Sequence, residues 1–120
     1  MDNITLSLSK IGVDVNNIIS RLGDNEQLYI SICRKFSKDP NYQGFQDAIA
    51  AKDYNNTLIQ IHTLKGLAAN LGFVRLEQIS KVILEDVKNN KEPMQRDINE
   101  LSKEYNKIIN ILNSENADSN

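Results

Sequence analysis

The stretch LIQIHTLKGLAANLG, residues 58–72, contains the only histidine of the 120-residue chain. Its apolar residues recur at helical spacing, which predicts a helix that begins at about Tyr54 and holds His62 in its middle. Lys65 and Gly66 follow His62 by three and four residues, so both lie one turn further along the same side. A glycine inside a helix costs roughly 1 kcal/mol relative to alanine, so Gly66 needs a reason in packing or in function.

A helical wheel at about 100° per residue separates two faces of this helix. The predicted core face holds six residues, with the stem of Lys65 at its edge: Tyr54, Leu58, Ile61, Leu64, Ala68 and Leu71. His62 points roughly 120° away from the centre of that face, so we expect solvent to reach it. The same side carries mostly small or apolar residues: Asn55, Ile59, Gly66, Ala69 and Phe73. Such a rim is typical of a docking surface, and it also fits a simple extension of the core.

Each part of this pattern has an ordinary explanation when it is taken alone. A single histidine on a helix usually lies on the surface, or has its hydrogen bonds satisfied inside the domain, without a special role. Lys65 alone fits a solvated lysine, and Gly66 alone fits close packing between two helices. Asn70 fits the end of the helix better than a contact with phosphate. A functional interpretation therefore depends on the combination.

Helical spacing of apolar residues predicts further helices on both sides of this one. The predicted elements are a short arm over 1–10, helices over 15–22 (capped by Asp14), 28–36, 45–52, 54–71, 76–87 and 94–112, with Pro93 in the first turn of the last helix. Asp53 is the predicted N-cap of the His62 helix, and Gly72 is its left-handed end. No stretch alternates as a strand does, so the predicted fold class is all-α, and amphipathic helices joined by short loops imply an up-down bundle.

Composition limits the class of protein. A chain of 120 residues with 40% apolar and 25% charged residues is typical of one globular domain. Its net charge of -2 gives no reason to expect nucleic acid or an anionic membrane surface as a partner. No apolar run is long enough to cross a bilayer, and the N-terminus lacks the pattern of a signal peptide. The single Cys33 excludes an internal disulfide, fits a cytoplasmic protein, and is expected to be buried and inert. We expect a monomer.

The segments 62–66 (HTLKG) and 70–72 (NLG) resemble the active helix of histidine-containing phosphotransfer (Hpt) domains, the relay modules of multistep two-component signalling. The resemblance extends over residues 11–112. It implies an antiparallel four-helix bundle formed by the last four helices, with short N-terminal helices packed at one end. The domain is then expected to span residues 1–113, followed by a flexible polar tail at 114–120.

The resemblance also implies a mechanism. Neutral imidazole is a competent nucleophile near pH 7, so His62 is expected to accept a phosphoryl group from a receiver-domain aspartate and to pass it to another response-regulator aspartate. Lys65 would offset charge on the phosphoryl oxygens, and Gly66 would leave room for the partner. Three apolar residues are predicted to form the docking rim: Ile59, Ala69 and Phe73.

Cofactors and partners follow from the same interpretation. No carboxylate cluster lies beside His62 in the sequence, so no metal site is predicted, and the resemblance implies that Mg²⁺ is supplied by the partner receiver domain. No Gly-rich nucleotide motif is present, so we expect no self-phosphorylation from ATP and no enzyme in the usual sense. The implied partners are receiver domains of response regulators, a hybrid sensor histidine kinase, or both.

The sequence departs from the family pattern at two places. Leu67 and Phe73 stand where small residues are frequent, which predicts a more apolar rim. Glu85 is displaced by one residue from the position at which a polar side chain can face the histidine, and one residue turns it by roughly 100°. We therefore do not expect Glu85 to orient His62. Two alternative functions stay open: the phosphoacceptor domain of a chemotaxis-type histidine kinase, and a helical adaptor that binds receivers without chemistry.

Overall fold

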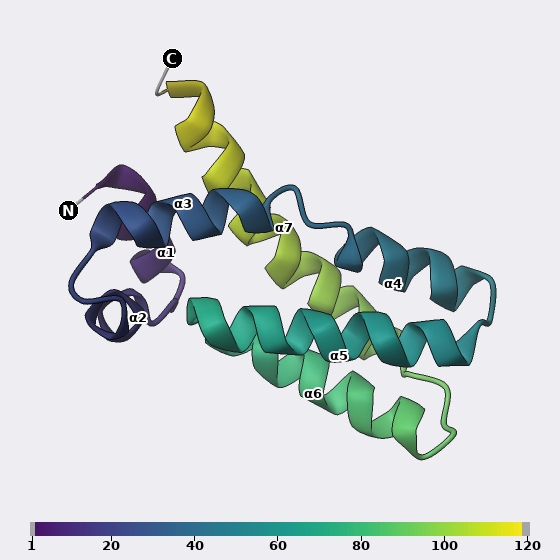
Figure 1. Ribbon diagram of the computed structural model, residues 1–120. Helices are drawn as coiled ribbons and strands as arrows, with labels where there is room; N and C mark the ends of the chain where they lie inside the picture. Colours follow the sequence, from purple (N-terminus) through teal and green to yellow (C-terminus); the bar gives the residue numbers. More distant parts are fainter. Residues whose placement is uncertain (1, 119–120) are drawn as a thin grey trace.

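The computed structural model describes residues 2–118, with side chains to residue 114, and this part of the chain contains helices and no strand. The predicted all-α class is therefore confirmed. The helices, shown in Figure 1, are α1 (Asn3–Lys10), α2 (Val15–Arg21), α3 (Glu26–Phe36), α4 (Asn41–Ala50), α5 (Tyr54–Leu71), α6 (Val74–Lys88) and α7 (Gln95–Asp118). None of these helices is long and apolar enough to cross a membrane.

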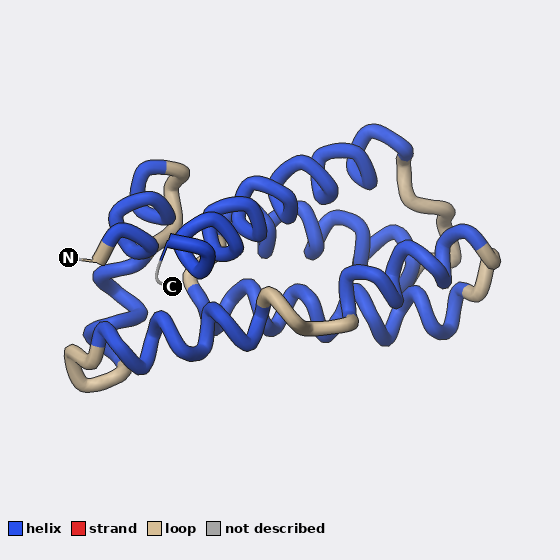
Figure 2. Tube along the Cα trace, turned by 90° about the horizontal axis from the view of Figure 1, so that it is seen from above, coloured by secondary structure: helices blue, strands red, loops and turns tan. Residues whose placement is uncertain are grey.

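The helix α5, which contains His62, has the largest share of the packing. It packs against α4 on one side and against α6 on another, and α6 in turn packs against α7. α3 and α4 follow one another along the same side of α5, joined by a loop that lies midway along the molecule (Figures 1 and 2). Most other loops lie at the two ends, because the longer helices run lengthwise between them (Figure 2).

Local sequence signals determine where α5 begins and ends, as predicted. The Asp53 side chain accepts a hydrogen bond from the Asn56 backbone N–H at 3.1 Å, which satisfies one of the free donors of the first turn. Gly72 adopts φ 77°, and its N–H donates to carbonyls of the last helical turn. A side chain at Gly72 would also collide with α2, because a Cβ there would lie 2.8 Å from Ile18 Cγ1.

The core face of α5 is mostly the predicted one. Four of the predicted residues are buried: Ile61, Leu64, Ala68 and Leu71. Leu58 and the Lys65 stem are half-buried at its edge, as expected for the flank of an amphipathic helix. Tyr54 is 46% exposed, so its assignment to the core is wrong. It occupies the first turn of α5, where the helix reaches the end of the molecule and few neighbours remain to cover it (Figure 1).

The N-terminal segment is part of the fold and not an arm on its surface. The Asp2 carboxylate accepts a hydrogen bond from the Ile4 N–H at 2.9 Å, which caps α1. Ile4 and Leu8 are buried, and α1 packs against α7. The predicted arm is therefore a core helix, whose apolar residues at four-residue spacing are buried as α1 packs on α7.

Hydrogen bonds join the start of α2 to the end of α5. Asp14 occupies the N-cap position of α2, as predicted, but its carboxylate makes no capping bond. It accepts instead from the Asn17 side-chain amide at 3.0 Å, while its backbone N–H donates to the Gly72 carbonyl at 2.9 Å. The Tyr29 hydroxyl of α3 donates to the Leu71 carbonyl at 2.8 Å. Two carbonyls at the C-terminus of α5 are thus satisfied by the N-terminal helices.

Cys33 lies next to this junction, completely buried and without a disulfide partner. Burial raises the pKa of its thiol to about 12, well above the ordinary value, so the thiolate is scarce at neutral pH. Burial also raises the pKa of Tyr29, with a smaller contribution from Cys33. The predicted buried position of Cys33 is confirmed.

The last helix differs from its prediction at both ends. α7 begins at Gln95, so Pro93 precedes the helix instead of occupying its first turn, and the Met94 carbonyl accepts the first helical bonds, from Asp97 and Ile98. Met94, predicted on the inner stripe, is exposed for this reason. The backbone of α7 is helical to Asp118, whereas residues 119 and 120 of the predicted tail lie outside the described residues. The domain limit at residue 113 stays a prediction.

Candidate functional site

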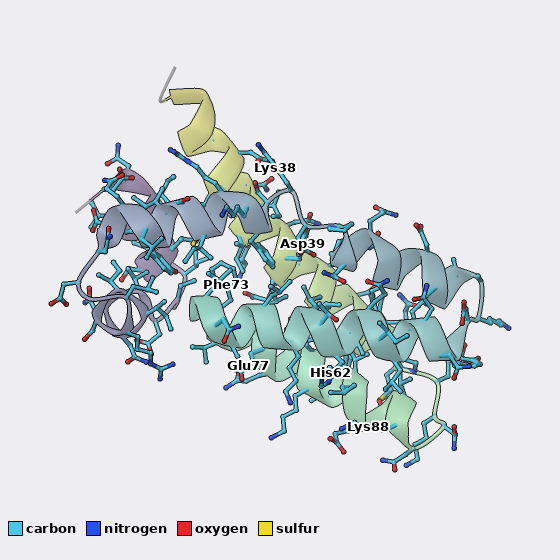
Figure 3. The ribbon with its side chains drawn as sticks, viewed as in Figure 1. Lys38, Asp39, His62, Phe73, Glu77 and Lys88 are labelled. Atoms are coloured by element: carbon cyan, nitrogen blue, oxygen red, sulfur yellow. The ribbon has the colours of Figure 1, made fainter. Side chains whose placement is uncertain are left out.

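His62 lies in the middle of α5 with its side chain exposed, as predicted. Figure 3 shows it on the side of α5 that meets α6, away from α4. Among the residues with described side chains, none donates a hydrogen bond to His62, accepts one from it, or forms an ion pair with it. The imidazole is therefore open to attack an electrophile that approaches from outside the domain.

Lys65 follows one turn later, half-buried along its stem. The ion pairs found among the described side chains lie elsewhere: Arg75–Glu100, Arg96–Asp97 and Lys107–Glu104. No carboxylate within this part of the chain pairs with Lys65, so no ion pair inside the domain competes for its ammonium group. Such a charge can interact with an anionic group that reaches His62.

Gly66 has no packing reason within the described structure. A Cβ built at Gly66 would meet no atom within 4 Å. The other helical glycine, Gly44 of α4, shows the opposite situation, because a Cβ there would lie 2.8 Å from the Gln60 side chain of α5. Close helix packing therefore explains Gly44 and does not explain Gly66. Packing inside the domain therefore does not account for the free-energy cost of a glycine inside α5. We infer that the reason for Gly66 lies outside the domain.

The three predicted docking residues fall in different environments. Ile59 is 61% exposed one turn before His62, and Ala69 is half-buried. Phe73 is 1% exposed, so its assignment to a docking rim is wrong. Its ring packs edge-on against Phe36, with centroids 5.1 Å apart. The helical wheel misplaced Phe73 because α5 ends at Leu71 and the chain reverses at Gly72, which turns the next side chain inward.

Leu67, which like Phe73 stands where the family often has a small residue, is half-buried. It lies on the wall of a hollow that was not predicted from the sequence. We call this hollow the α2–α3–α5 groove. It has a volume of about 510 Å³ and is lined by Ile18, Leu22, Ile32, Lys35, Phe36, Asp39, Leu67, Asn70 and Leu71. Its walls come from three helices, so no single stretch of sequence could predict it. Asn70, interpreted as a helix-ending residue, is exposed and lines this groove.

Glu85, the carboxylate weighed in the sequence as a neighbour of His62, is exposed on α6, and no hydrogen bond joins it to His62 within the described residues. A group of three or more side chains of the kinds that ligate metals does not occur in the part of the chain that the structure describes.

The comparison with protein families agrees with these features. The model of the Hpt domain family matches residues 39–111, which is more than half of the chain. The matched part includes α4, α5, α6 and most of α7, whereas α1, α2 and α3 precede it. Searches of curated proteins and of solved structures found no match.

Proposed function

Because this chain belongs to the Hpt domain family, whose members carry phosphoryl groups on histidine in two-component signalling, we propose that it is a phosphorelay intermediate that uses His62. In this role His62 accepts a phosphoryl group from a receiver-domain aspartate and passes it to an aspartate of another response regulator. One observation carries the proposal: the only histidine of the chain is exposed on the family-matched α5. One turn away lie Lys65, which forms no ion pair with a described side chain, and Gly66, at which an added Cβ would meet no atom within 4 Å.

The chemistry needs only groups that are present here or on the partner. An imidazole nitrogen attacks the phosphorus of the aspartyl phosphate, so an N–P bond forms while the P–O bond breaks and the carboxylate leaves. In the second step an aspartate oxygen of the next receiver attacks, the N–P bond breaks and the neutral imidazole returns. Phosphoryl transfer has a loose transition state, so alignment and charge are the main contributions of the protein.

We assign the two neighbours of His62 to those contributions. The Lys65 ammonium lies one turn from His62 and offsets negative charge on the transferring oxygens. The bare backbone at Gly66 allows the receiver loops to approach α5 closely. Ile59 and Ala69 belong to the surface that the receiver covers, since both lie within two turns of His62 on the same side of α5.

Mg²⁺ belongs to the partner in this proposal. The described residues contain no group of three or more potential metal ligands, so in this proposal a metal ion that neutralises the phosphoryl group is held by the receiver domain. The lack of a Gly-rich nucleotide motif in the sequence supports a carrier without autokinase activity.

The finer points of the fold belong to the same proposal. We propose that α4, α5, α6 and α7 form an up-down four-helix bundle, which the packing of α4 on α5, α5 on α6 and α6 on α7 supports. The shorter N-terminal helices then cover one end. We expect a cytoplasmic monomer that binds receiver domains, a hybrid sensor kinase, or both.

Two alternatives predict different behaviour. A phosphoacceptor domain of a chemotaxis-type kinase would receive phosphate from an ATP-binding domain in preference to receivers. A helical adaptor would bind receivers and take no phosphate. Incubating the purified chain with phosphorylated receiver domains separates them, because only the relay intermediate accepts label from one receiver and delivers it to a second.

The experiment compares the wild-type chain with His62→Gln. We expect the wild type to take up phosphate and the variant to take up none, while circular dichroism and receiver binding stay unchanged. Uptake by the variant would rule out His62 as the acceptor. Lys65→Ala tests the role of the cation, for which we expect transfer to slow by roughly tenfold or more at unchanged thermal stability, since an electrostatic contact to a transferring group contributes about 1–3 kcal/mol.

A further inference from the structure

The flank of α5 that carries His62 faces α6. The opposite flank faces α4, since a Cβ built at Gly44 of α4 would lie 2.8 Å from the Gln60 side chain. His62 follows Gln60 by two residues, which turns it about 200° around the helix. Figure 3 accordingly shows His62 on the side of α5 that meets α6. Side chains on the near flank of α6 are therefore the ones that can reach a group bound to His62.

Two lysines lie on that near flank of α6. The other flank faces α7, because Arg75 forms an ion pair with Glu100 of α7 at 3.8 Å. Lys81 and Lys88 follow Arg75 by six and thirteen residues, which turns them by about 120–140° to the opposite side of the buried face of α6. Both lysines are exposed. Figure 3 shows Lys88 and His62 towards the same edge of the molecule.

The two lysines also lie on either side of His62 along the helix axis. His62 lies nine residues before the end of α5, and Ile83 lies nine residues after the start of α6, so the two are level in this antiparallel pair of helices. Lys81 precedes that level by two residues and Lys88 follows it by five. These separations correspond to about 3 Å and about 7.5 Å along the axis. Both ammonium groups can therefore turn towards a group on His62.

The charge around His62 is positive on balance. The ion pairs among the described side chains do not include either α6 lysine. Two carboxylates share this part of α6: Glu85, between the two lysines, and Glu77, further towards the start of the helix. Lys65 of α5 adds a third cation, so three cations from two helices face these two carboxylates. This excess occurs in a chain whose net charge is -2.

We propose that Lys81 and Lys88 hold the phosphoryl group once it is bound to His62, and that they shift the transfer equilibrium towards the phosphorylated domain. The inference rests on the function proposed above and adds residues of a second helix to its site. Phosphorylation replaces a neutral imidazole by a phosphoimidazole that carries up to two negative charges. Nearby cations favour the charged product over the uncharged imidazole. The domain thus retains phosphate between the two transfer steps.

The equilibrium constant for transfer tests this inference without interference from docking. It compares the free phosphorylated and unphosphorylated forms of domain and receiver, so the affinity of their complex does not enter it. The constant is measured for the wild type and for Lys81→Gln/Lys88→Gln, with a receiver that phosphorylates the wild type. The control, Lys38→Gln/Lys103→Gln, also changes the net charge from -2 to -4, at exposed positions outside α5 and α6. Lys38 and His62 lie at opposite edges of the molecule (Figure 3).

We expect the α6 variant to lower the equilibrium constant roughly fivefold and the control to stay within about twofold of the wild type, since each exposed charge contributes modestly. Lys81→Arg/Lys88→Arg keeps both charges and should match the wild type. An α6 variant that behaves like the control would overturn the inference and leave the proposed function intact. A wild type that takes phosphate from no receiver would instead overturn the proposed function.

A second measurement needs no receiver. Phosphoramidate, a small phosphoryl donor, is used to phosphorylate His62, and phosphorus NMR follows the titration of the bound phosphoryl group. Cations from α6 lower the pKa of that group because they favour its doubly charged form. We expect this pKa to be higher by roughly 0.5 in Lys81→Gln/Lys88→Gln than in the wild type, and unchanged in the control. Equal phosphoryl pKa values in the three proteins would overturn the inference, whatever the outcome with receivers.

Discussion

Replacing Gly66 by alanine should stabilise the domain and impair its transfer reaction. An added methyl group would meet no atom within 4 Å, so the substitution introduces no clash inside the domain. Alanine is favoured over glycine in a helix interior by about 0.8–1.0 kcal/mol. For a domain of this size we expect the Tm to rise by about 4 °C.

The same methyl group is expected to obstruct the receiver. If the receiver backbone approaches α5 at Gly66, an extra methyl in a close-packed contact costs about 1–3 kcal/mol. Transfer from a phosphorylated receiver should therefore slow by roughly tenfold or more. Thermal unfolding by circular dichroism and single-turnover transfer rates measure the two effects on the same preparation.

Gly44→Ala is the matched control, because Gly44 also lies inside a helix. Its added Cβ would lie 2.8 Å from the Gln60 side chain, so the gain in helix propensity is offset by displacement of that side chain. We expect a smaller rise or a loss in Tm and an unchanged transfer rate. A Gly66→Ala domain that is less stable than wild type, or that transfers at the wild-type rate, would refute the interpretation of Gly66 as clearance for a partner.

Three further predictions concern the junction between α5 and the N-terminal helices. Gly72→Ala should lower the free energy of unfolding, measured by urea titration, by about 2 kcal/mol. Alanine is strained at φ 77°, and its Cβ would lie 2.8 Å from Ile18 Cγ1. A change below about 0.5 kcal/mol would contradict this. Tyr29→Phe should cost about 1–3 kcal/mol by leaving the Leu71 carbonyl without its buried donor, and equal stability in thermal unfolding would argue against that hydrogen bond. Burial raises the pKa of Cys33 from 9.0 to about 12, so the folded state holds the thiol proton more tightly than the unfolded state does. The stability that the protonated thiol contributes is complete below pH 9 and is lost as the pH rises towards 12. Cys33→Ala should therefore flatten this part of a plot of unfolding free energy against pH.

Local signals in the sequence were sufficient for most of α5. The carboxylate of Asp53 and the missing side chain of Gly72 mark the two ends of the helix, and both act through neighbours within one turn. The exposure of His62 followed from periodicity because α5 is long and regular over that stretch. These features depend on short-range geometry, which a sequence contains directly.

Features that depend on the path of the chain were not accessible in this way. Phe73 was misplaced because a wheel cannot be continued through the reversal at Gly72. The segment before Lys10 carried a helical pattern too short to distinguish from an arm, and burial against α7 is what makes it a core helix. The α2–α3–α5 groove exists only once three helices from different parts of the chain are assembled.

The site of phosphorylation tests the proposed role of His62 most directly. The wild-type chain is labelled by a phosphorylated receiver. The labelled residue is identified by mass spectrometry of peptides kept at alkaline pH, and the type of bond to phosphorus is identified by phosphorus NMR. We predict a single phosphoryl group on His62, stable in alkali and lost in acid, as expected for an N–P bond. Label on any other residue, or no label under conditions in which the receiver itself is phosphorylated, would contradict the assignment of His62 as the phosphoryl carrier.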